Sequence, residues 1–376
     1  MGSLRSILPG NTALNGICPY FTMFPLTFPY AVLKQHAQPG QWVLDPFCGR
    51  GTTNYAGRLL GLPSIGIDSS PVAAAVAQAK LANATPHEIV AAARNILDSY
   101  TKPKDEPEGE FWEWAFHKDV LSTICRFREA LLDDCAGDPR KALRAILLGA
   151  LHGPQPKSQP SYFSNQAPRT YAPKPRYSVR YWKSHGLKPP KVDVLRIIEQ
   201  RAQRYYSEVP CNPGGRVICA DSRDQSLTSA LIVDKAVSWI VTSPPYYGMR
   251  TYIPDQWLRM WFLGGGPTVS YSNDKQLTHS SPEKFALQLR TVWRNIGAVA
   301  ADDARMVIRF GGINDRKADP LAVIRSSLAD SGWRIDAVQA AGTAAEGRRQ
   351  ALHFARTQNR ALEEHDIWTS KEPTAN

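Results

Sequence analysis

The stretch between Gly40 and Ala84 restricts the possible folds of this chain more than any other part of the sequence. A short apolar run precedes a turn with two glycines, and a second apolar run ends at an acidic residue. Ser70 and Pro71 then have the residue types preferred at the N-cap and first position of a helix. The predicted elements are a strand over Gln41–Leu44, a turn over Asp45–Thr53, a helix to Leu60, a strand over Ser64–Ile67 and a helix over Val72–Leu81. This order predicts the βαβ unit of a doubly wound parallel sheet.

The same alternation of strands and helices resumes near Gly215. The apolar patterns predict strands over Val217–Ala220, Val237–Thr242, Met306–Phe310 and Arg334–Val338, and a last strand pair within Leu352–Trp368. They predict helices over Asp255–Leu263, Pro282–Ile296 and Pro320–Ala329. We therefore predict one α/β, Rossmann-like, mostly parallel doubly wound sheet, formed by residues 1–95 and 215–376. Residues 96–214 would interrupt it as an insertion.

The insertion carries the excess positive charge of the chain. The protein has 45 Lys and Arg against 34 Asp and Glu, and eleven of the basic residues lie between Pro139 and Val192, where no acid occurs. Without these eleven, the chain has 34 basic and 34 acidic residues. We predict two helices over Phe111–Leu151 and irregular backbone over Gly153–Pro190.

Aromatic residues alternate with the basic ones in the irregular part, as in surfaces that contact phosphates and bases. A solvated linker is the alternative. The residues predicted to contact nucleic acid are Arg169, Lys174, Arg176, Tyr177, Arg180, Tyr181, Trp182 and Lys183.

Acidic residues and glycines at the predicted strand ends indicate a nucleotide site. Gly49 and Gly51 allow a tight turn and close approach of a ligand to the backbone. Asp45 can anchor an ammonium group or order the loop. Asp68 is positioned to accept the hydroxyls of a ribose. Asp221 can accept from an adenine amino group, with the amide of the next residue, Ser222, facing a ring nitrogen.

A second motif, Ser243-Pro244-Pro245-Tyr246, follows the predicted strand Val237–Thr242. Consecutive prolines lack amide hydrogens and fix φ, so the carbonyls of Ser243 and Pro244 are held outward. Such carbonyls can accept from the exocyclic amine of a base, and Tyr246 can stack on it. A proline-stiffened turn is the alternative for an isolated motif of this kind.

The strings VLDPFCGRGTT, GIDSSP, ADS and TSPPY together resemble the DNA amino-methyltransferases that use S-adenosylmethionine (AdoMet), and TSPPY is most similar to the N4-cytosine subgroup. The resemblance covers roughly residues 20–85 and 215–370. It implies AdoMet as cofactor, and Phe24–Tyr30 loosely resembles a segment lining its methionine pocket. Many enzymes with SPPY are circularly permuted, whereas here the cofactor loop comes first. The residues assigned to the cofactor are Asp45, Pro46, Phe47, Gly49, Gly51, Thr52, Asp68, Asp221 and Ser222.

The resemblance implies methyl transfer from AdoMet to the N4 amine of cytosine in duplex DNA, with the base flipped out and the methyl group displaced in line. Ser243, Pro244, Pro245 and Tyr246 would bind the flipped base. N6-adenine methylation is the closest alternative, followed by an RNA amino-methyltransferase and a protein-glutamine methyltransferase. A non-catalytic nucleic-acid-binding module is the alternative from another class.

Other sequence features predict the setting of this reaction. The six cysteines form no CxxC pair, and no Cys/His cluster has zinc spacing, so we expect free thiols and no metal. The apolar run Ile17–Leu33 is interrupted by three prolines and predicts neither a signal peptide nor a membrane span. We expect a cytoplasmic, nucleoid-associated protein of prokaryotic or phage type. The resemblance leaves open a cognate restriction endonuclease as a second partner beside DNA.

Overall fold

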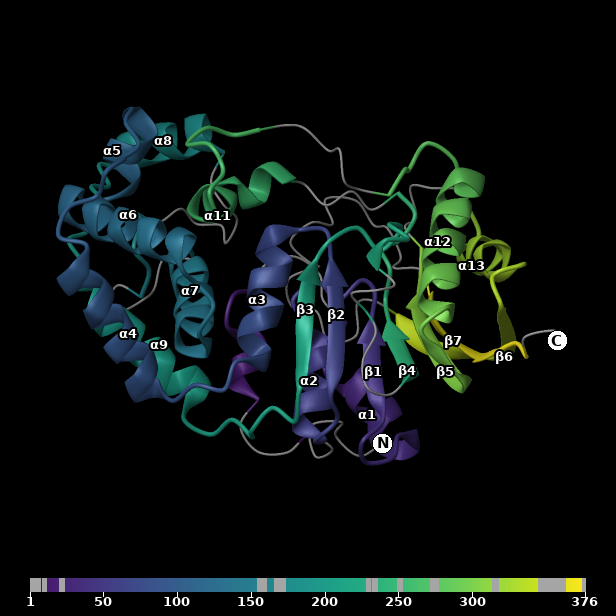
Figure 1. The fold of residues 1–376 in the computed structure, drawn as a ribbon. Coiled ribbons are helices and arrows are strands. Elements are labelled where there is room, and N and C mark those ends of the chain that lie inside the picture. Colours follow the sequence, from purple (N-terminus) through teal and green to yellow (C-terminus); the bar gives the residue numbers. More distant parts are fainter. Residues whose placement is uncertain are drawn as a thin grey trace.

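A computed structural model describes residue 8 and residues 12–19, 24–153, 161–165, 174–227, 231, 236–248, 253–270, 277–312, 318–343 and 363–373. Its centre is a seven-stranded sheet in the order β3-β2-β1-β4-β5-β7-β6 (Figure 1). The strands are β1 (Trp42–Asp45), β2 (Ser64–Asp68), β3 (Gly215–Cys219), β4 (Val237–Thr242), β5 (Ala300–Phe310), β6 (Trp333–Thr343) and β7 (Glu363–Lys371). The first five are parallel, and β7 runs antiparallel to β5 and β6. The predicted Rossmann-like doubly wound sheet is confirmed.

Alternating side chains of the central strands enter two hydrophobic cores, one on each face of the sheet. Val43, Trp239 and Val241 face one core, while Leu44 and Ile240 face the other. Helices α12 (Pro282–Gly297) and α13 (Pro320–Leu328) cover the second face. The first face is covered by α1 (Thr27–His36), α2 (Thr52–Leu59) and α3 (Pro71–Leu81), with a short 3₁₀ turn, η2 (Ala13–Gly16), before them. Hydrophobic side chains on both faces therefore fix the sheet as a buried, central layer.

A layer of helices lies beyond α3 and forms one side of the molecule (Figure 1). It contains α4 (Pro86–Ser99), α5 (Glu110–Ala115), α6 (Lys118–Asp133), α7 (Asp138–Ala150), α8 (Pro175–Ser184) and α9 (Val194–Tyr206). The stretch Phe111–Leu151 thus holds three helices rather than two, because the chain breaks at Phe116 and His117 before α6. The irregular backbone predicted over Gly153–Pro190 contains a helix, α8. The layer begins at Pro86, ahead of the predicted boundary at residue 96, and the domain division itself stays a prediction.

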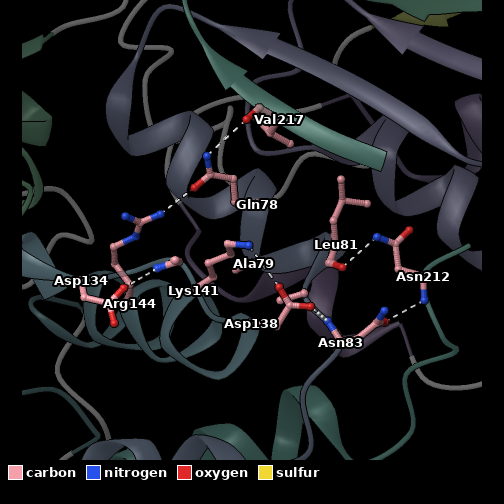
Figure 2. A network of polar contacts seen from close by, with 12 residues as sticks. Gln78, Ala79, Leu81, Asn83, Asp134, Asp138, Lys141, Arg144, Asn212 and Val217 are labelled. Carbon is pink, nitrogen blue, oxygen red and sulfur yellow. Dashed lines mark hydrogen bonds and ion pairs between the residues drawn. The ribbon is translucent and has the colours of Figure 1, made fainter. Parts of the chain in front are cut away.

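Polar side chains attach the helical layer to the sheet (Figure 2). The Arg144 guanidinium on α7 donates to Gln78 Oε1 on α3 at 2.6 Å, and the Gln78 amide donates to the Val217 carbonyl on β3. A second chain of contacts runs from Asp138, which accepts from the Asn83 amide at 2.8 Å, to Asn212 ahead of β3. These contacts fix β3 against α3 and α7, and β3 leads directly into the predicted cofactor residue Asp221.

The segment after β4 is held between the sheet and the helical layer. It contains the 3₁₀ turn η3 (Ile253–Gln256) and α11 (Trp257–Phe262). Trp257 and Trp261 pack on Phe111 and Trp112 of α5, with ring centroids 4.9 Å apart for Phe111 and Trp257. None of the described helices is long and apolar enough to cross a membrane. All six cysteines are free thiols.

Candidate cofactor and base-binding site

The carboxyl ends of β1, β2, β3 and β4 meet at one edge of the sheet, because these strands are parallel neighbours. Asp45 ends β1 and is fully buried, and Thr242 ends β4. The Thr242 hydroxyl donates to Asp45 Oδ1 at 2.6 Å, and the Phe47 amide donates to the same oxygen at 3.1 Å. The carboxylate therefore connects the glycine turn after β1 to the start of the Ser243–Tyr246 segment.

Burial dominates the electrostatics of Asp45. It raises the pKa of this carboxyl to about 6, although the hydrogen bond from Thr242 acts in the opposite direction. Asp45 Oδ2 is buried and has no hydrogen-bond partner among the described residues. Of the two roles predicted for Asp45, the observed contacts match the ordering of the loop.

The glycine turn is held closed by backbone hydrogen bonds. The Gly51 amide donates to the Cys48 carbonyl at 2.7 Å, and the Cys48 amide donates to the Ile67 carbonyl of β2 at 2.9 Å. Gly49 and Gly51 both have positive φ, +50° and +69°, which glycine adopts at little cost. A Cβ on Gly49 would meet no described atom within 4 Å, so its backbone is open to close approach by a ligand.

We expect substitution of the two glycines by alanine to reduce stability by different amounts. We expect Gly51→Ala to lower the free energy of unfolding by about 2–5 kcal/mol, because positive φ strains alanine by about 1–2 kcal/mol and overpacking adds about 1–3. Its Cβ would lie 2.8 Å from Ala77 Cβ on α3. Gly49→Ala is the matched control. It should lower the free energy of unfolding by only about 1–2 kcal/mol, from backbone strain alone. Denaturant unfolding of both variants measures the difference, and equal losses would contradict the packing of Gly51 on α3.

Asp68, predicted to bind ribose hydroxyls, lies beside the glycine turn. Its Oδ2 accepts from the Gly49 amide at 2.9 Å and its Oδ1 accepts from the Ser70 amide at 2.8 Å. Burial raises the pKa of Asp68, and the two amide hydrogen bonds lower it by a smaller amount. Each carboxylate oxygen has more than one acceptor site, so Asp68 can hold the turn and still accept from a hydroxyl.

The end of β3 contributes a residue that the sequence analysis missed. Arg223 forms an ion pair with Asp221, with Nε 2.9 Å from Oδ1 and 3.0 Å from Oδ2. Asp221 therefore presents its carboxylate already bound to a guanidinium. Ser222 is buried, and its hydroxyl donates to the Pro46 carbonyl at 2.5 Å. This contact joins the loop after β3 to the loop after β1.

The Ser243–Tyr246 segment leaves β4 at this edge, with Pro244 and Tyr246 buried and Ser243 and Pro245 half-buried. The Tyr246 ring is 6% exposed, packs edge-on against Phe310 and donates its hydroxyl to Glu364 Oε1 at 2.6 Å. Glu364 lies on β7, and its role could not be predicted because no local pattern connects it to Tyr246. The tyrosine predicted to stack on a base is thus hydrogen-bonded to β7, two strands away from β4 in the sheet.

The aromatic residues predicted near the cofactor differ in how deeply they are buried. Phe47 is half-buried and packs edge-on against Trp293 of α12, with ring centroids 6.0 Å apart. Within Phe24–Tyr30, Phe28 is buried on α1, and the Arg309 guanidinium lies 3.8 Å from its ring centroid. This segment packs into the core between α1 and the sheet.

The residues predicted to contact nucleic acid divide into an exposed group and a buried one. Arg169 lies outside the described residues. Trp182 is fully buried against Phe111, with centroids 5.9 Å apart, so the prediction that it contacts nucleic acid is wrong: it faces the interior side of α8. The others are at least partly exposed, namely Lys174, Arg176, Tyr177, Arg180, Tyr181 and Lys183.

Comparisons with known proteins match part of this chain to DNA methyltransferases. Residues 6–79 match the N6/N4 methyltransferase family model, described as DNA methylase. Over 92 residues the chain is 35% identical to the Type II methyltransferase M.MjaII of Methanocaldococcus jannaschii, a match that covers 24% of this chain and 17% of that protein. The matched region is thus a small part of this relative. Across the matched segments, the resemblance to DNA amino-methyltransferases is confirmed.

Two methyltransferases are among the solved structures that the comparison matches to this chain at low TM-scores. The rRNA methyltransferase AviRa of Streptomyces viridochromogenes is 13% identical, with a TM-score of 0.38, and the alignment covers 98% of this chain and 94% of that one. Magnesium protoporphyrin IX methyltransferase of Synechocystis PCC 6803 is 10% identical, with a TM-score of 0.35, and covers 96% and 90%.

The residues assigned to the cofactor fit a nucleoside ligand. Asp68 and Asp221 offer carboxylates at adjacent strand ends, and the open side of Gly49 leaves backbone accessible between β1 and β2. The start of the proline segment is hydrogen-bonded to the same loop through Thr242 and Asp45. A cofactor and a substrate group bound at this edge would therefore be adjacent, as the crevice at the switch point of a doubly wound sheet requires.

Proposed function

We propose that this chain methylates the exocyclic N4 amine of cytosine in duplex DNA, with S-adenosylmethionine as methyl donor. The observation that carries this proposal is the 2.6 Å hydrogen bond between Thr242 and Asp45, which joins the base-binding segment to the cofactor loop. The DNA methylase match over residues 6–79 contains that cofactor loop and supports the same class of reaction. The TSPPY form of the segment after β4 favours cytosine.

The residues of the chain would orient the base rather than activate it by strong base catalysis. The Ser243 and Pro244 carbonyls would accept both protons of the target amine, which localises its lone pair. When bound, the cofactor supplies an electrophilic methyl group on a sulfonium. The methyl group would pass from this sulfonium to the amine nitrogen held by the two carbonyls, and the methylated nitrogen would then lose one proton to solvent. Positioning of the two reactants accounts for most of the rate enhancement.

N6-adenine methylation is the second candidate, because the matched family model carries both N6 and N4 in its name. The same carbonyls would accept from the adenine amine, whose geometry differs little at the nitrogen. Extrusion of either base costs a few kcal/mol and leaves the rest of the mechanism unchanged.

Nucleoside analysis of methylated DNA tests the proposal. The chain is incubated with AdoMet labelled in the methyl group and with mixed-sequence duplex DNA, and the DNA is digested to nucleosides. We expect label in N4-methylcytosine and less label with Pro244→Ala, because alanine keeps the carbonyl but no longer fixes the φ angle that holds it outward. Label in N6-methyladenine would overturn the choice of base, and no label in DNA despite measurable AdoMet binding would overturn the choice of substrate.

A further inference from the structure

Helix α8 has two faces of opposite character. Its inner face consists of Ser178, Val179 and Trp182, which are buried against the helical layer. Its outer face carries Arg176, Tyr177 and Arg180, which are exposed, beside the partly exposed Tyr181. The helical period, rather than the composition of the stretch, therefore determines which of its basic and aromatic residues reach solvent.

The two arginines of the outer face lie one helical turn apart without neutralising partners. Like charges at this spacing repel each other and destabilise a helix. Within the described part of the chain, neither Arg176 nor Arg180 forms an ion pair. Other basic residues of the acid-free stretch do, including Arg140 with Asp134, Lys141 with Asp138, Lys183 with Glu110 and Lys191 with Asp119. The outer face of α8 thus carries two positive charges that no ion pair among the described residues compensates.

An aromatic column runs beside the arginines. Tyr177 and Tyr181 are nearly parallel, with ring centroids 6.5 Å apart and planes 19° apart. The column continues to His185, 4.1 Å from Tyr181. Tyr177 is 55% exposed, so much of its side chain is accessible to a partner. Arginines beside solvent-facing rings are the combination that binds phosphate and stacks on nucleic-acid groups.

Helix α8 is also coupled to the segment that follows the base-binding residues. Phe111 contacts both Trp182 of α8 and Trp257 of α11. Lys174, just before α8, is close enough to Asp255 of η3 to affect its ionisation: burial raises the pKa of Asp255 to about 6, and the lysine charge opposes this. A partner held on α8 would therefore have a fixed position relative to the chain that follows Ser243–Tyr246.

We propose that the outer face of α8 binds the phosphate backbone of duplex DNA, through Arg176 and Arg180, with Tyr177 and Tyr181 packing against the sugar and exposed bases. This inference rests on the proposed function for the choice of DNA as the partner. The positive charge complements a polyanion, and Phe111 connects α8 to α11, the helix that follows the Ser243–Tyr246 segment in the chain. Trp182 contributes from the inner face by holding the helix in place.

Charge reversal tests the arginines. In the chain of 376 residues, we expect Arg176→Glu/Arg180→Glu to weaken binding of a labelled duplex at least tenfold. The slope of log K against log salt should fall by about 1.8, since each lost phosphate contact removes about 0.9. The matched control is Arg94→Glu/Arg196→Glu, on exposed positions of α4 and α9, with the same change in net charge. Equal losses of DNA affinity in the two double variants would mean that only net charge matters and would overturn the proposal. Unchanged DNA affinity in both double variants would also overturn it.

The aromatic column has its own test. Tyr177→Ala/Tyr181→Ala should weaken duplex binding about threefold to tenfold with an unchanged salt slope, because no charge is removed. Full affinity in this variant would overturn the role of the rings. Stronger binding of the wild-type chain to single-stranded RNA than to duplex DNA would overturn the choice of partner.

Two readouts separate this inference from the proposed function. AdoMet affinity is measured for every variant and should not change with the α8 substitutions. A wild-type chain that binds duplex DNA through α8 but transfers no methyl group would contradict the reaction and leave the surface intact. Normal methylation and DNA affinity in the charge-reversed variant would support the reaction and overturn the surface.

Discussion

Asp45→Ala is expected to remove measurable AdoMet binding and to lower the free energy of unfolding by about 2–6 kcal/mol. The change deletes the acceptor of both the Thr242 hydroxyl and the Phe47 amide. Each buried donor left without a partner costs about 1–3 kcal/mol. The glycine turn and the Ser243–Tyr246 segment would then no longer be held together. Thermal unfolding and calorimetric titration with AdoMet measure the two losses.

Asp45→Asn is the control that separates the two roles predicted for this residue. Asparagine keeps an acceptor oxygen for Thr242 and Phe47, and places its amide where Oδ2 has no partner among the described residues. If Asp45 orders the loop, this variant should keep AdoMet affinity within about tenfold of the wild type. A loss as large as that of Asp45→Ala would mean instead that the negative charge contacts the cofactor.

The pH dependence of stability provides an independent check on Asp45. Because burial raises the pKa of Asp45 to about 6, the folded chain keeps a proton that the unfolded chain releases near pH 4. This group therefore favours folding below pH 4, and that contribution is lost as the pH rises to 6. Relative to the wild type, Asp45→Asn should gain stability between pH 4 and pH 6. A constant difference between the two proteins would contradict the raised pKa.

The parts of the site that follow from local sequence were predicted, because short-range rules determine them. The glycine turn after β1 requires two positive φ angles, and the Ser70-Pro71 pair starts α3 with the expected cap, since Ser70 accepts from the Ala73 amide. Parallel pairing of β1 with β2 and β4 then brings Asp45, Asp68 and Thr242 to one edge without further information.

The parts that were not predicted depend on contacts between distant segments. The Tyr246–Glu364 hydrogen bond joins residues 118 positions apart, and no periodicity identifies such a pair. The burial of Trp182 was not predicted for a different reason. The prediction rested on the composition of the stretch before residue 190, and composition does not distinguish one residue of the stretch from another. The helical period of α8 does, because it directs Trp182 inward and Arg176 outward. Treating that stretch as a helix would have predicted the burial from the sequence.

Tyr246→Ala should lower kcat/KM for duplex DNA by about tenfold to a hundredfold while leaving AdoMet affinity unchanged. Loss of base–aromatic stacking costs about 1–3 kcal/mol per base. The substitution also leaves a cavity beside Phe310, so part of any loss can reflect destabilisation. Tyr205→Ala is the matched control, because Tyr205 is 5% exposed, close to the 6% of Tyr246, but lies on α9 in the helical layer. Its activity should fall only in proportion to the folded fraction.

Tyr246→Phe separates the ring from its hydroxyl. It retains the stacking surface and removes the hydrogen bond to Glu364, so stability should fall by about 1–3 kcal/mol and kcat/KM should stay within tenfold of the wild type. Steady-state kinetics on a duplex whose target base is mismatched adds a further distinction, since extrusion of that base costs less. The defect of Tyr246→Ala should persist on this substrate if the ring acts on the extruded base. Rescue of Tyr246→Ala by the mismatch would mean that Tyr246 acts in extrusion instead. A loss of kcat/KM in Tyr246→Phe equal to that in Tyr246→Ala would assign the effect to the hydroxyl and its contact with β7.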